Sequence, residues 1–154
     1  MCHVASATFP PLPRSPGHAR RWTQGHLDAW GVDDAVLTLL VSEVVTNSVR
    51  HARSPATLTL ALSAGRLEVG VVDDEESVHV FGLGGGTHVA DHGEPLAESG
   101  RGLRLLDALA HAWGVTRTPS GKRVWFHRLV TTDGNLAGTC RCEAPVLQTR
   151  DACA

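Results

Sequence analysis

A polar stripe runs along one helix-patterned stretch of the sequence, 40-LVSEVVTNSVRHA-52. Glu43, Asn47, Arg50 and His51 form the stripe, because spacings of three and four residues meet on one helix face. An asparagine carboxamide is a hard oxygen ligand suited to Mg²⁺, which takes few protein ligands. A carboxylate one turn away is placed to accept a proton from an attacking hydroxyl. The competing interpretation is the solvated face of an amphipathic helix.

Two further features carry groups suited to a nucleotide. Asp73 ends a β-branched stretch, and its carboxylate would accept a hydrogen bond from an exocyclic amine such as that of adenine. Gly100 and Gly102 flank Arg101 where another helix pattern begins; glycine permits close backbone approach, and a helix N-terminus offers free N–H groups to phosphate. Taken singly, these residues have ordinary interpretations as a turn former, a helix cap and a surface charge. Together they favour a nucleotide site.

Periodicity predicts the elements that must position these groups. Leu37, Val41, Val44 and Ser48 share the helix face beside the polar stripe and are expected to face a core. The patterns predict helices over 15–29, with Ser15 as its cap, from an aspartate cap within 32-VDD-34 to about 52, and over 101–115. They predict strands or extended segments over 3–9, 56–63, 66–73, 113–118 and 123–130, with the turn 119-PSGK-122 before the last. This order predicts an α+β fold, a two-layer sandwich with helices on one face of a mostly antiparallel sheet.

The composition is that of a globular domain. A length of 154 residues with 42% apolar residues supports one domain, and a net charge of -2 gives no general reason to bind nucleic acid or an anionic membrane. The start of the chain lacks the apolar segment of a signal peptide, so a cytoplasmic location is expected. We predict an N-terminal strand and connector over 1–14, a domain over 15–130, and a disordered tail over 131–154 that carries three of the four cysteines.

The ordered motifs resemble the GHKL (Bergerat-type) ATP-binding fold, also described as the histidine-kinase-like ATPase domain. Within that fold they are most similar to the branch of anti-sigma-factor serine/threonine kinases. The resemblance covers residues 15–130. It rests on 43-EVVTNSVRHA-52 as the N box, Val71-Val72-Asp73 and 100-GRGL-103 as the two glycine boxes, and 121-GKRVWF-126 as the closing strand. Residues 74–99, with the glycines of 82-GLGGG-86, stand where the family has its lid; a hinge over ATP and a disordered insert are equally good interpretations.

The resemblance implies a function and roles for residues. It implies ATP and Mg²⁺ as cofactors and phosphorylation of a serine or threonine on a STAS-type anti-sigma-factor antagonist. Glu43 would act as or assist the general base, Asn47 would bind Mg²⁺, and Asp73 would bind adenine. The phosphate side would be formed by His51, Gly100, Arg101, Gly102 and Leu103. Relatives of this type also form homodimers, so a homodimer is expected.

Two departures from the family pattern favour a rival function. Asp73 is followed by Asp74, Glu75 and Glu76 where nucleotide-binding relatives often have glycine, and clustered acids repel a polyanionic ligand. Arg123 stands where the closing strand often has a threonine suited to an adenine contact. The rival is a non-catalytic binding module that sequesters a sigma factor or another regulator, with weak or no nucleotide binding.

Overall fold

The computed structural model describes residues 3–74 and 100–132 of the chain, which form five strands and three helices. In chain order these are β1 (His3–Phe9), α1 (Ser15–Ala29), α2 (Ala35–His51), β2 (Ala56–Ser63), β3 (Arg66–Asp73), α3 (Gly100–Leu109), β4 (Ala112–Thr118) and β5 (Gly121–Leu129).

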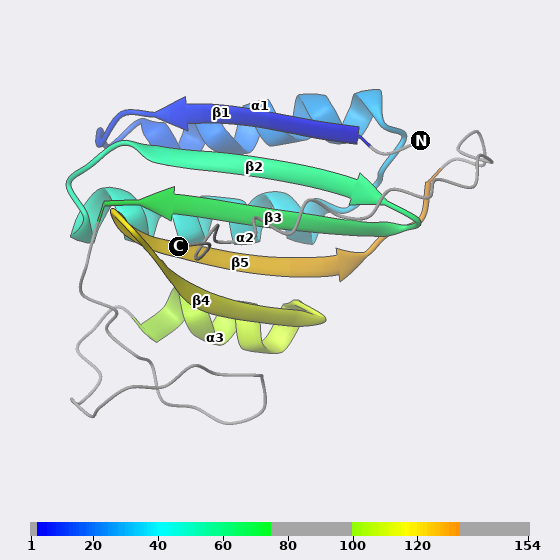
Figure 1. The fold of residues 1–154 in the computed structure, drawn as a ribbon. Helices are drawn as coiled ribbons and strands as arrows, with labels where there is room; N and C mark the ends of the chain where they lie inside the picture. The colour runs from blue at the N-terminus through cyan, green and yellow to red at the C-terminus, as the bar shows by residue number, and fades with distance from the viewer. Residues whose placement is uncertain (1–2, 75–99, 133–154) are drawn as a thin grey trace, which may run out of the picture.

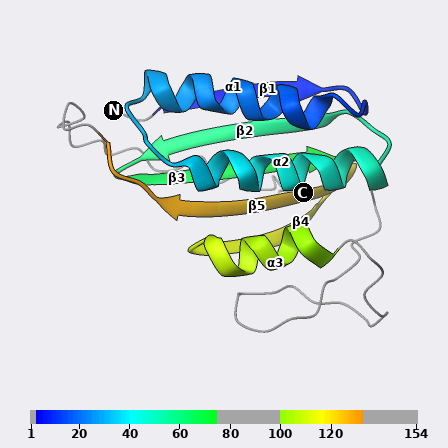
Figure 2. The ribbon, with the colours of Figure 1, turned by 180° about the vertical axis from the view of Figure 1, so that it is seen from behind.

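The strands form one antiparallel sheet in the order β1-β2-β3-β5-β4, and the three helices lie along one face of it (Figures 1 and 2). The predicted α+β sandwich with helices on one face is therefore confirmed. The order also places β5 between β3 and β4, so the start of β5 lies beside the end of β3. Asp73 and Lys122 are direct partners across that pair of strands.

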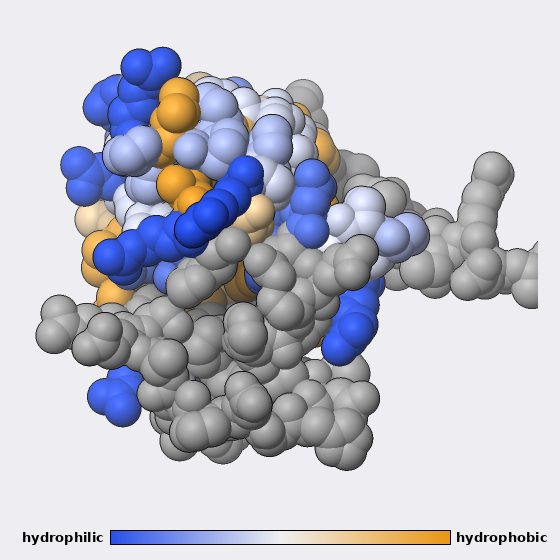
Figure 3. Space-filling view, turned by 90° about the vertical axis from the view of Figure 1, so that its left-hand side faces the viewer, coloured by the Kyte–Doolittle hydropathy of each residue, from blue (hydrophilic) through white to orange (hydrophobic). Residues whose placement is uncertain are grey.

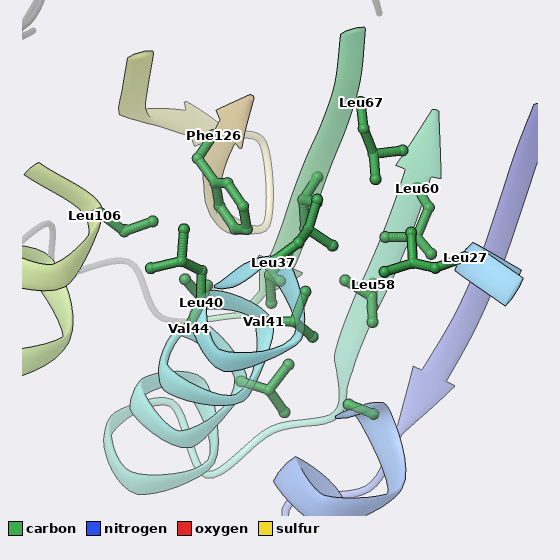
Figure 4. Close-up of a cluster of buried hydrophobic side chains, with 14 of the residues drawn as sticks. Leu27, Leu37, Leu40, Val41, Val44, Leu58, Leu60, Leu67, Leu106 and Phe126 are labelled. Atoms are coloured by element: carbon green, nitrogen blue, oxygen red, sulfur yellow. The ribbon is translucent and has the colours of Figure 1, made fainter. Parts of the chain in front are cut away.

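The core lies between the sheet and α2. Alternate residues of β2 and β3 are buried, as the period of two along a strand requires, and Leu37, Val41 and Val44 of α2 pack against them (Figure 4). Fully burying each such side chain contributes about 1.5–3 kcal/mol. Ser48 is buried on the same face. The predicted apolar face of this helix is confirmed. Its packing against the sheet fixes the position of the polar stripe on the neighbouring face of α2.

Two helix ends differ from their predictions. The helix predicted over 101–115 stops at Leu109, because pairing with β5 takes over and His111 already donates its N–H to the carbonyl of His127. Ser15, predicted as a helix cap, is the first residue of α1, and its hydroxyl instead donates to the carbonyl of Pro10 at 2.6 Å. By contrast, the predicted aspartate cap of α2 is confirmed, and it is Asp34, whose carboxylate accepts the N–H of Leu37 at 3.2 Å.

The expected lid and tail lie largely outside the described residues. Residues 75–99 contain most of the lid segment, and residues 133–154 contain Cys140, Cys142 and Cys153. Thr132, the last described residue, forms an isolated antiparallel bridge with Val32. None of the helices in the described part of the chain is long and apolar enough to cross a membrane.

Candidate functional site

Four elements meet at one end of the domain: the C-terminal half of α2, the end of β3, the start of α3 and the start of β5 (Figures 1 and 2). Antiparallel pairing of β3 with β5 places a strand end beside a strand start. Past α2, the hydroxyl of Ser54 accepts the backbone N–H of Asp74 at 3.0 Å and joins this segment to the end of β3. The motifs of the sequence are thus gathered at one end. Viewed from that end, the described surface is largely hydrophilic, with a few apolar residues among the polar ones (Figure 3).

The polar stripe of α2 lies beside its buried face. Glu43 and Asn47 are half-buried, and Arg50 is exposed. Within residues 3–74 and 100–132, no hydrogen bond or ion pair engages the side chain of Glu43 or Asn47. A carboxylate and a carboxamide one helical turn apart, with their oxygens not bound elsewhere in the described structure, fit a hard cation such as Mg²⁺.

Among the described residues, Asp73 is the most buried charged group at this end, with 1% of its surface exposed. The ammonium of Lys122 lies 3.4 Å from Asp73 Oδ1, and the Lys122 side chain is 15% exposed. Burying a carboxylate is costly unless it is paired, and Lys122 supplies a charge of opposite sign. The sequence reasoning missed Lys122, which it placed in a turn. Lys122 is the only lysine of the chain, but no neighbouring residue in the sequence indicated that it pairs with Asp73.

Gly121 permits the close approach of the two strands. Its φ is +153°, and a Cβ placed on it would lie 2.0 Å from the backbone oxygen of Asp73. A side chain at this position would therefore force β3 and β5 apart. This role was also missed, because a glycine in a predicted turn has many uses.

The residues expected on the phosphate side lie at the ends of two helices. Gly100, Arg101, Gly102 and Leu103 occupy the first turn of α3, and His51 is the last residue of α2. Their backbone places them at the same end of the domain as Asp73. The contacts of these side chains lie outside what the structure describes, so their assigned roles stay predictions.

Arg123 lies on the opposite face of the sheet from the site. Successive strand residues point to opposite faces, so Lys122 points toward the helices and Arg123 points away. Arg123 extends across the bare backbone of Gly70, where a Cβ would lie 2.8 Å from its Nε, and donates to Glu68 at 2.8 Å. The residue of the closing strand that contacts Asp73 is thus Lys122.

Charged residues on this face of the sheet, which no helix covers and which is called the open face below, shift two pKa values. Burial raises the pKa of Glu68, but the hydrogen bond and charge of Arg123, with a smaller effect of Arg66, leave it below its ordinary value of 4.5. Burial lowers the pKa of His127 below its ordinary value of 6.5, and the charge of Arg66 lowers it further. Neither shift involves a residue of the candidate site.

At the far end of the domain, Arg128 of β5 fixes both helices that carry the site. Its Nε donates to Asp34 Oδ2 at 2.6 Å, and its guanidinium also donates to the carbonyl of Leu109. Asp34 caps the start of α2, and Leu109 ends α3. One arginine therefore holds α2 and α3 in register with the sheet, and with them the polar stripe and the glycine turn.

Comparisons with known proteins identify the family. The histidine kinase-like ATPase domain profile matches residues 9–128. The chain belongs to this family. An uncharacterized protein of Streptomyces coelicolor is 41% identical over 78 residues, which cover 49% of this chain and 68% of that protein.

A solved structure shares the fold. It contains the RsbU and RsbW domains of Rv1364c from Mycobacterium tuberculosis and matches with a TM-score of 0.62 at 17% identity over 83% of this chain. This chain spans about a third of that larger one, 32% of its length. The expected GHKL-type fold is confirmed, and the family is one of ATPase domains.

Proposed function

We propose that this protein is an ATP-dependent serine/threonine kinase of the anti-sigma-factor type, which phosphorylates a STAS-type antagonist protein. The observation that carries the proposal is that the C-terminal half of α2, which contains Glu43 and Asn47, lies at the same end of a histidine kinase-like ATPase domain as the end of β3 with the buried Asp73 and the glycine-flanked start of α3. Phosphoryl transfer needs positioning and charge stabilisation more than covalent chemistry, and these are the groups that supply it.

Each residue has a separate task in the proposal. Asn47 would hold Mg²⁺ through its amide oxygen, and the ion would neutralise charge on the transferred phosphoryl group. Glu43, one turn before it, would accept the proton of the attacking hydroxyl. Asp73 would accept a hydrogen bond from the exocyclic amine of adenine. The phosphates would be bound by the first turn of α3 at Gly100, Arg101, Gly102 and Leu103, with His51 beside them.

The proposal extends to the setting of the protein. We place it in the cytoplasm, as a regulator of transcription that acts through an antagonist protein, a sigma factor or both, with a homodimer as its assembly. These statements rest on the resemblance of the motifs to anti-sigma-factor kinases.

The second candidate function is a binding module that sequesters a regulator without catalysis. The ion pair between Lys122 and Asp73 favours the binding module, because the carboxylate expected to contact adenine already has a partner of opposite charge. The acidic residue Asp74 beside it also disfavours a polyanion.

A nucleotide titration distinguishes the two functions. We expect ATP and ADP to bind in the presence of Mg²⁺ and to raise the melting temperature, because a ligand that binds only the native state stabilises it. Asn47→Ala should abolish the Mg²⁺-dependent part of the affinity. Glu43→Ala should retain binding and lose transfer of labelled phosphate to an antagonist, because a base acts on the reaction rather than on ground-state affinity.

Thr46→Ala is the matched control for these variants. Its hydroxyl donates to the backbone of the same helix, at the carbonyl of Ser42, and it has no role in the proposal. Calorimetry should show Thr46→Ala to bind like the wild type. Nucleotide binding by the wild type without phosphorylation of any antagonist would favour the binding module, and no binding at all would exclude the kinase.

A further inference from the structure

Arg53, just beyond the end of α2, has a strained backbone. Its φ is +51°, in the left-handed region that glycine adopts without a penalty. Among the described residues, the other side chain with a positive φ is Ala64, which lies in the hairpin turn between β2 and β3. Helices commonly end with glycine in this conformation, and a residue with a Cβ is less stable there.

No contact within the described residues explains why an arginine occupies this position. Arg53 and Arg50 are both exposed, and in residues 3–74 and 100–132 neither side chain forms an ion pair or a hydrogen bond. Asp74 is joined to the same segment through its N–H, which Ser54 accepts, but its carboxylate pairs with neither arginine. Strained residues that the fold does not need are concentrated at functional sites.

The two arginines lie next to the proposed transfer site and face solvent. Arg50 follows Asn47 by three residues, so at about 100° per residue its side chain leaves the helix roughly 60° away from that of Asn47. Arg50 is exposed and Asn47 is half-buried, in agreement with this rotation. Arg53 is exposed beyond His51, the last helical residue. Both charges therefore face a molecule that approaches this end of the domain from solvent.

We propose that Arg50 and Arg53 form a docking surface for an acidic segment of the protein substrate. This inference rests on the proposed function and deepens it, because it gives a chemistry to the partner on which Glu43 would act. Charge complementarity is the argument: two cations without a negative partner in the described structure match carboxylates on another protein. A guanidinium can bind a carboxylate through two parallel N–H bonds, which adds direction to the attraction.

The test uses the strained backbone to separate binding from folding. The probe is a short fluorescein-labelled peptide of glutamates around one serine, and its control has glutamine in place of every glutamate. Arg53→Gly should weaken binding of the glutamate peptide by about fivefold, the upper range for an exposed ion pair. The same substitution should raise the melting temperature by about 2–4 °C, because glycine relieves the backbone.

Two further variants define the surface. Arg50→Gln combined with Arg53→Gly should weaken binding of the glutamate peptide more than Arg53→Gly alone. Arg21→Gln is the matched control, because Arg21 is an exposed arginine on α1, and it should bind the peptide like the wild type. Fluorescence anisotropy measures these affinities, and added salt should weaken binding to the wild type, since the proposed contact is exposed.

Several results would overturn the inference. They are equal affinity of the wild type for the two peptides, an unchanged affinity in Arg53→Gly, or a lower melting temperature of that variant. A single-stranded oligonucleotide that binds more tightly than the glutamate peptide, with the same dependence on Arg53, would assign the surface to nucleic acid instead.

Titration with ADP and Mg²⁺ separates this inference from the proposed function. ADP should bind Arg53→Gly as it binds the wild type. If Arg53→Gly loses affinity for ADP but not for the peptide, the arginine belongs to the nucleotide site and the inference is wrong. If ADP binds the wild type and the peptide does not, the inference fails and the nucleotide site stands. If ADP binds none of these proteins, the proposed function fails whatever the peptide does.

Discussion

The two ends of β5 each carry an ion pair on the helix-covered side of the sheet, and the pairs differ in kind. At one end, Arg128 contacts Asp34 at 2.6 Å and also donates to the carbonyl of Leu109, so it joins β5 to both α2 and α3. At the other end, Lys122 lies 3.4 Å from Asp73, its neighbour across two paired strands. A planar guanidinium makes several bonds in fixed directions, whereas an ammonium is a compact point charge on a flexible stem.

This difference separates a supporting end from the end that we propose binds nucleotide, called the binding end below. The arginine pair ties together three elements where no motif of the family is found. The lysine pair lies where the polar stripe, the strand end and the glycine turn meet. Binding sites are commonly drawn from the less rigid parts of a domain, since groups that contact a ligand must be able to exchange partners.

The largest expected effect comes from breaking the arginine pair. Arg128→Met should lower the free energy of unfolding by about 3–5 kcal/mol, because it leaves the carboxylate of Asp34 without its cation and the end of α3 without its donor. Lys122→Met should lower it by less, about 1–3 kcal/mol, because Asp73 is more buried but the ammonium makes one 3.4 Å contact with it, whereas Arg128 makes bonds to two helices. Chemical denaturation measures both, with the exposed Arg117→Met as control. A larger loss for Lys122→Met would reverse the assignment of the two ends.

A glycine substitution at the binding end comes next. Gly121→Ala should cost about 2–4 kcal/mol, because a Cβ at φ +153° would lie 2.0 Å from the backbone of Asp73 and backbone cannot move aside cheaply. Gly70→Ala is the matched control in the neighbouring strand, where the Cβ meets the movable end of Arg123; its change should stay within about 1 kcal/mol. Thermal and chemical unfolding would show whether the two substitutions differ. Equal losses would remove the special role of Gly121.

The smallest effect concerns the open face of the sheet at β5, opposite the side that carries the Arg128–Asp34 and Lys122–Asp73 pairs. His127 has a folded-state pKa below 6.5, so the unfolded chain binds its proton first as the pH falls. Stability should therefore decrease slightly as the pH falls from about 7 through 6.5 to the folded-state pKa, since solvent screening keeps the effect small, and His127→Gln should abolish this loss.

Glu68 acts in a lower pH window on the same face. Its folded-state pKa lies below 4.5, so its contribution is present above that pH and is lost as the pH falls further. Unfolding curves measured at several pH values separate the two groups. An unchanged slope between pH 7 and 5.5 in His127→Gln would show that His127 is not the responsible group.

Local patterns in the sequence determined most of the elements. The periodicity of 15–29 and the two strands over 56–63 and 66–73 matched the structure in their bounds, and the face of α2 that carries Leu37 and Val41 is buried as predicted. These features depend on residues a few positions apart, so a sequence displays them directly. The order of the motifs also indicated the family. Individual roles at the site, such as that of Asn47, remain predictions.

Only the tertiary structure decided which distant charges meet. Asp34 and Arg128 lie 94 residues apart, and Lys122 faces Asp73 only because β5 lies between β3 and β4. The end of α3 at Leu109, and not near residue 115, likewise depends on pairing with β5. The reason is that strand register and helix placement are set by packing across the whole sheet, whereas periodicity reports only which face of an element is apolar.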